Sequence, residues 1–378
     1  MISRNENCVE CRACVQKCPV KCISFTEFGK ITIENQKCIH CNLCDSVCQL
    51  KKDVIFNKPG SVYAALWNDN LLREQSSSGG IAQVLYRNII NQGGIVFGAK
   101  FNKDLIPEVI SASTFRDLES FKKSKYCFSN INNSFEECKM YCEEGKLVLY
   151  IGLPCQIAGL KLFLAKQYEN LILVDILCHG APHYSIFKNH IAYLSNRHGK
   201  KVIDYQFRNK KNDCYGPYNY EIHFEDDVCV TGSALWDAYY KSFLDATSFR
   251  RACYDCRYAT TARISDITIG DFWNASNYFK ELKNKKYISS LMINTQKGKK
   301  MIDICKNDLI LYESNIDALA NSTHAVCEPA HPIHPMIEDK LKNPTLYAKW
   351  ARKYELSFNV LLRKIKFFLL KQYFAERT

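Results

Sequence analysis

The sequence lacks the apolar segments that would carry a chain into or across a membrane. Its first ten residues, MISRNENCVE, contain no apolar signal-peptide core. No stretch of the 378 residues reaches the uninterrupted apolar length of a membrane-spanning helix. We therefore expect a cytoplasmic protein, in a reducing compartment where disulfide bonds are rare. The 20 cysteines are then expected to ligate metal rather than to form a disulfide framework.

Signatures of nucleic-acid binding are also missing, although the chain is strongly basic. The formal net charge is +12, and residues 349–378 alone carry eight Lys or Arg against two Glu. A charge of this size can attract nucleic acid or anionic lipids. Because no helix-turn-helix, zinc-finger or RNA-recognition pattern accompanies it, we expect no nucleic-acid partner.

Two cysteine runs open the chain. CVECRACVQKCP at 8–19 and CIHCNLCDSVCQ at 38–49 share the spacing C-x2-C-x2-C-x3-C. In bacterial ferredoxins three cysteines of such a run bind one 4Fe–4S cluster, and the fourth binds the cluster of the other run. Zinc, the alternative, does not require this crossed arrangement. Gln49 follows Cys48 where proline is usual, which removes no ligand. The pattern predicts one cluster on Cys8, Cys11, Cys14 and Cys48 and a second on Cys38, Cys41, Cys44 and Cys18.

The rest of the chain predicts an α+β fold in successive segments. A turn or linker at 57–60 follows the ferredoxin-type module of residues 1–56. Residues 60–200 alternate apolar strands with helical patterns, which is typical of parallel strands joined by helices. Residues 201–335 add aromatic-rich segments that predict antiparallel strands, and residues 336–378 form a basic helical tail. The strands are expected at 95–101, 147–152, 171–178, 205–210, 218–224 and 228–232, and the helices from 81 to the Gly93-Gly94 pair, at 156–166 and at 186–194.

A serine–glycine segment precedes the first of these helices. It consists of Ser76, Ser77, Ser78, Gly79 and Gly80. Backbone N–H groups at a helix start attract anions, serine hydroxyls add donors, and glycines let a ligand approach the backbone closely. The segment therefore predicts a phosphate site, and an ordinary serine helix cap is the alternative.

Four further cysteines are candidates for a third cluster. Cys155 lies where a predicted strand becomes a helix, and Cys178 ends the next strand. If these strands are parallel neighbours, both thiols lie at the carboxyl edge of one sheet, where ligands of open α/β sheets bind. The helix start is expected to favour the thiolate form of Cys155. Cys253 and Cys256 add a C-x2-C pair, which makes four ligands. Buried structural cysteines, or a lone redox thiol at Cys155, are the alternatives.

Six motifs in order resemble the beta-subunit family of the coenzyme F(420)-reducing hydrogenase and dehydrogenases, over residues 60–330. They are SSSGG at 76–80, SKY at 124–126, GLPCQIAGL at 152–160, CHG at 178–180, FRNK at 207–210 and CYDCRYATTARISDITIGDFW at 253–273. The resemblance implies a flavin, FAD or alternatively FMN, bound by the serine–glycine segment and by Ser124, Lys125 and Tyr126. It also implies a third 4Fe–4S cluster on the four candidate cysteines. Residues 60–200 would be the flavin-binding part and residues 201–335 the C-terminal part of this region.

This resemblance predicts an iron–sulfur flavin-dependent oxidoreductase. Electrons would pass between a redox protein partner, such as a ferredoxin, the clusters, and a flavin that reduces or oxidises an organic substrate or a deazaflavin coenzyme. Bacterial members similar to this chain accompany polysaccharide biosynthesis. A non-catalytic electron-transfer subunit of a larger complex, or a structural member of one, are the alternatives. Leu153 replaces a usual threonine and Asn274 a usual glycine, and neither change removes a ligand.

Polar residues beside these motifs are candidates for chemistry. His179 follows Cys178 and has a side chain whose pKa lies near working pH, so it could move a proton; a structural hydrogen bond is the alternative. Arg208 and Lys210 could bind a carboxylate or phosphate, although a solvated edge strand would look the same. Asp271 could serve catalysis or end a turn.

The tail predicts one more helix, at 357–374. Its apolar stripe consists of Phe358, Leu361, Leu362, Ile365, Phe368, Leu369 and Tyr373, with Arg363, Lys364, Lys366 and Lys371 off the stripe. A basic amphipathic helix can bind peripherally to an anionic membrane, here at its inner face. A second apolar strip of Val360, Phe367 and Phe374 indicates the alternative, a helix packed on the protein or on a partner subunit.

Overall fold

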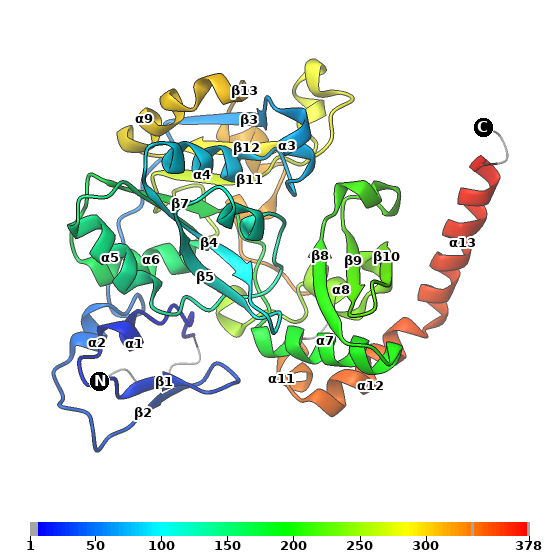
Figure 1. The fold of residues 1–378 in the computed structure, drawn as a ribbon, viewed down its shortest axis with the longest axis horizontal. Coiled ribbons are helices and arrows are strands. Elements are labelled where there is room, and N and C mark those ends of the chain that lie inside the picture. The colour runs from blue at the N-terminus through cyan, green and yellow to red at the C-terminus, as the bar shows by residue number, and fades with distance from the viewer. Residues whose placement is uncertain (1–6, 334–335, 376–378) are drawn as a thin grey trace.

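The N-terminal module packs beneath a large sheet in the computed structural model, which describes residues 7–333 and 336–375 (Figure 1). Its two short helices are α1 (Ala13–Lys17) and α2 (Leu43–Ser46), and its hairpin joins β1 (Ile23–Phe25) to β2 (Ile31–Ile33). Each helix carries the third cysteine of its run, Cys14 or Cys44. The preceding residues, Arg12 and Asn42, turn the chain into the helix with a left-handed backbone.

Eight strands form the large sheet, in the order β13-β3-β12-β11-β7-β6-β4-β5. Four central strands, β4, β6, β7 and β11, are parallel neighbours, which confirms the parallel core predicted from the alternating pattern. The outer strands pair antiparallel, and two of them, β3 and β5, come from the segment expected to be parallel. The bounds are β3 (Ser61–Trp67), β4 (Ile95–Phe101), β5 (Pro107–Ala112), β6 (Val148–Gly152), β7 (Leu171–Ile176), β11 (Ile267–Asp271), β12 (Ser289–Ile293) and β13 (Leu309–Ser314).

Helices cover both faces of this sheet. On one face α4 (Ile81–Asn91) and α9 (Gln296–Ile304) bury apolar side chains against the strands. On the other face lie α5 (Ser134–Glu143) and α6 (Pro154–Leu164), whose apolar side chains share a core with the cysteine-rich module. The module is therefore a third layer over this face rather than a separate globule. The short α3 (Asn70–Glu74) and α10 (Ile316–Ala320) complete this part.

The predicted aromatic-rich strands form a second, antiparallel sheet of order β10-β9-β8. It consists of β8 (Val202–Phe207), β9 (Asn219–Phe224) and β10 (Cys229–Ser233), which confirms all three expected strands. Its core includes residues of α7 (Tyr184–His198), α8 (Ala238–Leu244) and α12 (Pro344–Glu355), with α11 (Glu338–Leu341) beside them. The chain then returns to the large sheet through β11, so that sheet has strands from both sides of residue 200. The domain limits placed at 56, 200 and 335 stay predictions.

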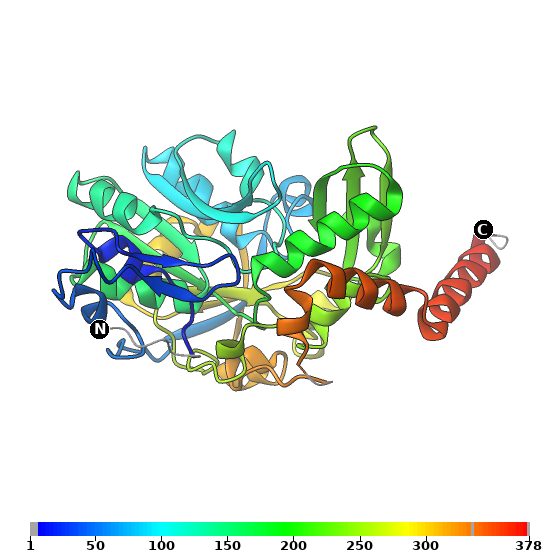
Figure 2. The same cartoon turned by 90° about the horizontal axis from the view of Figure 1, so that it is seen from below.

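The tail ends in α13 (Phe358–Ala375), which projects away from both sheets (Figure 2). Among the residues that the structure describes, no helix is both long and apolar enough to cross a membrane. The fold as a whole mixes a large α- and β-layered part with a smaller antiparallel part, as the predicted α+β class requires.

Candidate functional site

Three buried polar side chains of the module, Glu10, Gln16 and Gln49, connect it to the large sheet and its helices. The carboxamide oxygen of Gln16 accepts hydrogen bonds from the backbone N–H groups of Phe135 (3.0 Å) and Glu136 (3.1 Å), at the start of α5. These N–H groups have no partner within their own helix, so Gln16 supplies the acceptor that burial would otherwise leave missing. The module is therefore fixed against the body of the protein by directed bonds as well as by apolar contact.

Gln49 makes the bond nearest to the candidate third cluster. Its Nε2 donates to the backbone oxygen of Cys155 (2.9 Å), and its Oε1 accepts from the hydroxyl of Tyr258 (2.5 Å). Close by, Cys11 touches α6 at Gly159, where an added Cβ would lie 2.9 Å from the Cys11 sulfur. The residue that replaces the usual proline thus joins the first cysteine set to the helix that begins at Cys155.

Glu10 and Arg250 form the third connection. Arg250 is buried, donates from Nη1 to the backbone oxygen of Val9 (2.7 Å), and lies over the ring of Phe128. Its Nη2 lies 3.8 Å from the Cys253 sulfur, and its Nη1 lies 3.8 Å from the Glu10 carboxylate. Glu10 also lies 3.4 Å from the Nε2 of His183. A fixed positive charge therefore stands between the module and the candidate third cluster.

The thiols of the first predicted set lie together. Burial, with smaller contributions from the neighbouring Cys11 and Cys48, raises the pKa of Cys8 to about 12. Burial likewise raises the pKa of Cys14, with added contributions from these thiols. Buried thiols can become thiolates only where a positive group compensates their charge, and the irons of a cluster would do so. The set Cys8, Cys11, Cys14 and Cys48 therefore fits a buried metal cluster.

The second set lies nearer the surface and includes one cysteine that the sequence did not assign. Cys18 and Cys22 have sulfurs 3.5 Å apart. Burial, with smaller contributions from Cys18 and Cys38, raises the pKa of Cys22 to about 11, so Cys38 lies near this pair. Cys41 is exposed. Cys22 is buried, as a small hydrophobe would be, but it lies within the second set.

The four candidates for the third cluster also meet. Cys155 is the second residue of α6, Cys178 lies two residues after β7, and Cys253 and Cys256 lie in the loop before β11. Burial raises the pKa of Cys155 well above its usual value, and the other three thiols raise it further while Arg250 lowers it. The expected preference of Cys155 for the thiolate form is therefore wrong for the metal-free site, because desolvation outweighs the helix start. As thiolates these four partly buried groups would repel one another, and a cationic cluster core would compensate their charge.

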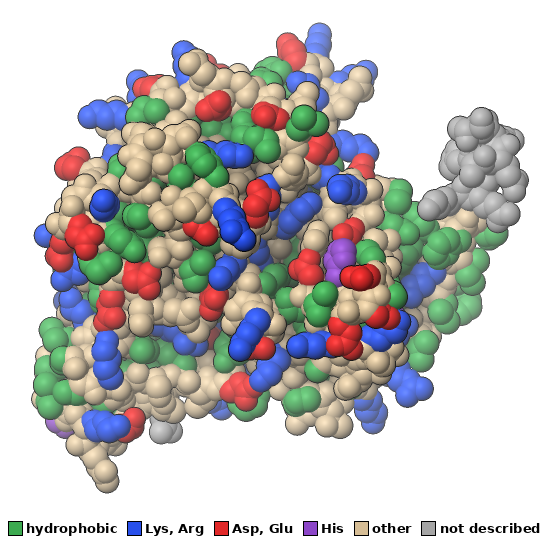
Figure 3. Space-filling model, in the orientation of Figure 1, with side chains coloured by type: hydrophobic (Ala, Val, Ile, Leu, Met, Phe, Trp, Pro, Cys, Tyr) green, Lys and Arg blue, Asp and Glu red, His purple; other side chains and the backbone are tan. Residues whose placement is uncertain are grey.

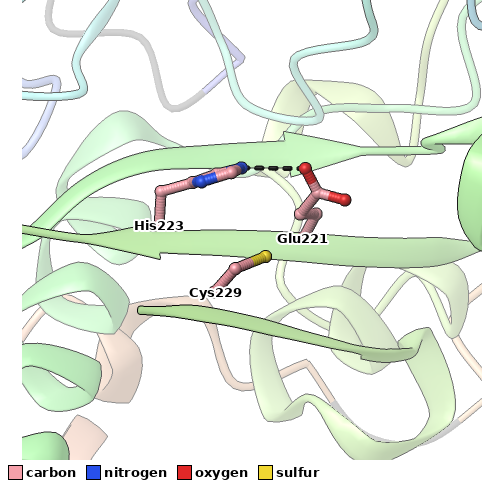
Figure 4. Close-up of side chains that lie close together, drawn as sticks. All are labelled: Glu221, His223 and Cys229. Atoms are coloured by element: carbon pink, nitrogen blue, oxygen red, sulfur yellow. Dashed lines mark hydrogen bonds and ion pairs between the residues drawn. The ribbon is translucent and has the colours of Figure 1, made fainter. Parts of the chain in front are cut away.

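The spacing of these cysteine sets argues against zinc. Four thiolates around one zinc ion, at the usual Zn–S distance, lie about 3.8 Å from one another. Within residues 7–333 and 336–375, no cysteine set brings three or more sulfurs within 4.8 Å of one another. The group that does meet this limit is Glu221, His223 and Cys229, on the β9–β10 hairpin (Figure 4). There Glu221 accepts from His223 (2.8 Å) and from Asn209 and Asn212, so its carboxylate is already hydrogen-bonded.

SSSGG and SKY line one cavity beside the carboxyl ends of β6, β7 and β11. The cavity has a volume of about 310 Å³. Its wall includes Ser76, Ser77, Ser78 and Gly80 from the first motif and Ser124, Lys125 and Tyr126 from the second, but not Gly79. At Gly79 an added Cβ would lie 2.4 Å from the backbone oxygen of Ala65, so the fold itself requires this glycine. The helix cap is Gly80 with no side-chain cap, so the alternative of a plain serine cap is wrong.

Buried polar atoms without partners indicate what kind of ligand this cavity fits. The hydroxyls of Ser76 and Ser77, two guanidinium nitrogens of Arg208 and one carboxylate oxygen of Asp271 have no hydrogen-bond partner. All four residues line the cavity. Because buried polar groups in folded proteins are nearly always paired, this set fits a polar ligand with both donors and acceptors. A flavin with its phosphate offers such groups.

The FRNK motif supports the cavity instead of forming a solvated edge strand. Arg208 is buried, and its Nη1 pairs with Asp271 at 2.5 Å. Lys210 is buried too, and its Nζ donates to the backbone oxygens of Arg73 and Ser78, each at 2.8 Å. Lys210 thus holds the serine–glycine segment in place, and Asp271 serves an ion pair that the sequence alone did not indicate.

A second cavity, of about 520 Å³, adjoins the first and borders the third cysteine set. Cys178 and His179 line it, and it shares Lys125, Leu153 and Asp271 with the first cavity. The ring of His179 meets those of Phe243 and Phe249 edge-on, at 5.4 and 5.0 Å between ring centroids. His179 therefore lies at the second cavity beside the third cysteine set, and a role in proton transfer stays a prediction.

One comparison with known proteins agrees with the motifs that lie between residues 145 and 318. Residues 145–318 match the family model that describes the C terminus of the coenzyme F(420) hydrogenase/dehydrogenase beta subunit. No curated protein matches the chain. Among solved structures, a chain of the F(420)-reducing nickel–iron hydrogenase complex from Methanosarcina barkeri, studied by xenon derivatization, is 16% identical with a TM-score of 0.47, over 80% of this chain and 91% of that chain. Residues 145–318, which carry the third cysteine set, are thus similar to the C terminus of the coenzyme F(420) hydrogenase/dehydrogenase beta subunit.

Proposed function

We propose that this protein is an iron–sulfur flavin-dependent oxidoreductase that exchanges single electrons at one end and acts on an organic molecule at the other. The proposal rests on the observation that the first cysteine set, the third cysteine set and the cavities adjoin one another in that order. Cys11 of the first set touches α6, that helix begins at Cys155 of the third set, and Cys178 of the third set borders the cavity next to the serine–glycine segment. Such continuity is what electron transfer between fixed centres requires.

The chain's own residues divide the work at these sites. The three cysteine sets would each hold a 4Fe–4S cluster, and the cavity lined by Ser76, Ser77, Lys125 and Arg208 would hold FAD or FMN. When bound, the clusters supply one-electron steps and the flavin supplies two-electron chemistry on an organic molecule or a deazaflavin. Arg208 and the serine hydroxyls would bind and orient the flavin. His179, which lines the second cavity, would hold or deliver a proton to the reacting molecule.

Electrons would enter or leave through the second cysteine set. Cys41 is exposed, and Ile39 and Leu43 beside it are 60% and 39% exposed. A small exposed apolar surface around a cluster suits the brief contact of a redox protein such as a ferredoxin.

The same surface would equally serve a pure electron-transfer subunit, whose substrate is handled by another chain. The second cavity beside His179 favours the enzyme, because a subunit without a substrate needs no open space there. A substrate from polysaccharide biosynthesis rests on the motif resemblance alone.

Anaerobic cofactor analysis tests the proposal. The purified protein is expected to contain about twelve irons, matching sulfide and one flavin. Cys155→Ser should lower iron by about four while the other two clusters keep their spectra. Cys305→Ser, which replaces a buried cysteine outside the three sets, is the matched control and should keep full iron. Unchanged iron in Cys155→Ser would remove Cys155 from the ligands.

A second experiment separates the enzyme from the subunit. Ser76→Ala with Ser77→Ala should release flavin without loss of iron, whereas Ser120→Ala, at an exposed position outside the cavity, should release none. Protein reduced with dithionite is then offered small-molecule acceptors with no protein partner present. Reoxidation by a small molecule, lost in His179→Gln, supports the enzyme. Reoxidation by a protein acceptor alone would identify a subunit, and clusters without flavin would indicate a structural role.

A further inference from the structure

The last helix, α13, has two apolar faces, and only one of them is used. On the inner face Val360 is buried and the ring of Phe367 meets those of Tyr215 and Trp236, at 4.9 and 5.2 Å between centroids. These contacts account for the second apolar strip of the sequence. The same contacts fix the helix at a set angle to the body, so its other side is held outward.

The outer face presents the predicted apolar stripe to solvent. At 3.6 residues per turn, this stripe lies opposite Val360 and Phe367. Six of its side chains are 42–73% exposed, and Figure 3 shows hydrophobic side chains gathered along this helix. They are Phe358, Leu361, Leu362, Ile365, Phe368 and Leu369, of which Phe368, at the edge of the strip, also meets the ring of Trp236 at 6.0 Å between centroids. Lys371, Tyr373 and Phe374 were also predicted for the two strips and their basic flank. Their side chains lie outside the part of the helix whose side chains the structure describes. Soluble proteins seldom leave so continuous an apolar strip uncovered, so it indicates a binding surface.

Basic side chains surround this strip. Arg363 and Lys366 are exposed on α13 itself. Next to α13, a groove between α7 and α12 is lined by Arg197, Lys349, Arg352 and Lys353, with Leu356 at 55% exposure. Between residues 344 and 369 the sole acidic residue is Glu355, which is buried and paired with Arg197. An uncompensated positive charge therefore borders the apolar strip.

We propose that α13 docks the protein on an anionic membrane surface, with its outer face among the acyl chains and the basic groove over the lipid phosphates. An amphipathic helix with aromatic and leucine side chains on one face and Lys or Arg beside it binds an interface in this way. The long Lys and Arg side chains can keep their charges at the phosphates while their stems lie along the apolar strip. The proposal is independent of the proposed redox function.

A second copy of the chain suits this face less well. In a two-fold dimer the same patch would meet itself, so Arg363 and Lys366 of both copies would come together. Like charges brought together at an interface oppose binding. An anionic lipid surface instead pairs each of these charges.

Co-sedimentation of the full-length protein with vesicles tests the proposal. Vesicles of equal parts phosphatidylglycerol and phosphatidylcholine are expected to bind the protein at low salt, and high salt should weaken the binding because the charges are then screened. Vesicles of phosphatidylcholine alone should bind it far more weakly. Free inorganic phosphate at matched concentration should not compete, which distinguishes a lipid surface from a phosphate site.

Two variants probe the two parts of the surface. Ile365→Glu with Leu369→Glu should weaken vesicle binding at least ~100-fold, because two apolar side chains that would insert among the acyl chains are lost. Arg352→Gln with Lys353→Gln should weaken it about 30-fold and flatten the salt dependence. Both pairs are exposed, so the fold should survive; Leu71→Glu, at an equally exposed leucine of α3, is the matched control and should bind normally. Protein that stays in the supernatant, or binds both vesicle types equally, overturns the proposal. A dimer in solution that Ile365→Glu with Leu369→Glu dissolves would identify a second copy as the occupant.

Discussion

Replacing Gln49 by leucine should loosen the module from the rest of the protein. Leucine keeps roughly the volume of glutamine but can neither donate to the backbone oxygen of Cys155 nor accept from the hydroxyl of Tyr258. Gln49 is 2% exposed and Tyr258 is 3% exposed, so water cannot take over these bonds without opening the interface. The substitution therefore leaves the buried Tyr258 donor unsatisfied and removes a second hydrogen bond from the Cys155 oxygen, which keeps its helical bond within α6.

The expected cost follows from these two groups. The unpaired Tyr258 hydroxyl costs about 1–3 kcal/mol and the lost second bond of the Cys155 oxygen about 0.5–1.5 kcal/mol, so we expect a loss of about 1.5–4.5 kcal/mol in the free energy that holds the module in place. Removing the second partner should restore part of this loss. In the double variant Gln49→Leu with Tyr258→Phe the unpaired hydroxyl is gone, so it should be about 1–3 kcal/mol more stable than Gln49→Leu alone.

The assay is anaerobic thermal unfolding of the iron-loaded protein, followed by the visible absorbance of the clusters. Gln49→Leu should lower Tm by several degrees, and the double variant should recover part of that shift. Gln92→Leu, at the exposed end of α4, is the matched control and should leave Tm unchanged. A wild-type Tm for Gln49→Leu would refute the reasoning, as would a double variant less stable than the single one, because either result means that the Gln49 bonds do not hold the interface.

Three further changes test other parts of the site. Gly159→Ala should destabilise the protein by about 1–3 kcal/mol, since the added methyl would lie 2.9 Å from the Cys11 sulfur; lower Tm and lower iron would show it. Burial lowers the pKa of Lys125 to about 7, so its positive charge, present below that pH, is lost as the pH rises through it. Flavin affinity of the flavin-depleted protein, measured by fluorescence quenching, should therefore fall about tenfold across this window, and Lys125→Met should show no such step. Arg208→Met should cost about 2 kcal/mol, because it leaves the partly exposed Asp271 unpaired, and should weaken flavin binding; unchanged Tm and affinity would argue against that ion pair.

Sequence patterns predicted the elements better than the contacts between them. The strands β4, β6 and β7 and the helices α4, α6 and α7 were predicted to within a few residues, because burial on both faces gives a parallel core long apolar runs. The same patterns did not show that β3 and β5 pair antiparallel, since the direction of pairing leaves no mark on a short apolar run.

In the candidate site, too, the sequence predicted some residues and could not predict others. Cysteine spacing grouped Cys8, Cys11, Cys14 and Cys48, whose thiols raise one another's pKa in the structure, because ligands of one cluster recur at short intervals. The grouping of Cys41 and Cys44 with Cys18 and Cys38 stays a prediction. Spacing could not find Glu10, Gln49 or Arg250, whose partners are distant in sequence; Gln49 alone left a signal, as a departure from the usual proline. Nor could it show that desolvation outweighs the helix start at Cys155, because burial depends on the tertiary fold.

The shared core of the module and the large sheet has a consequence for how the protein matures. Cys11, Cys14 and Cys18 are buried in the same apolar core as Phe135, Ile157 and Phe163 of α5 and α6. Iron delivered after this core has closed would have to reach ligands that are no longer accessible. A cluster held by these cysteines would therefore have to be inserted before or during the packing of α5 and α6, and iron supply during synthesis, rather than chain folding alone, would then set the yield of loaded protein.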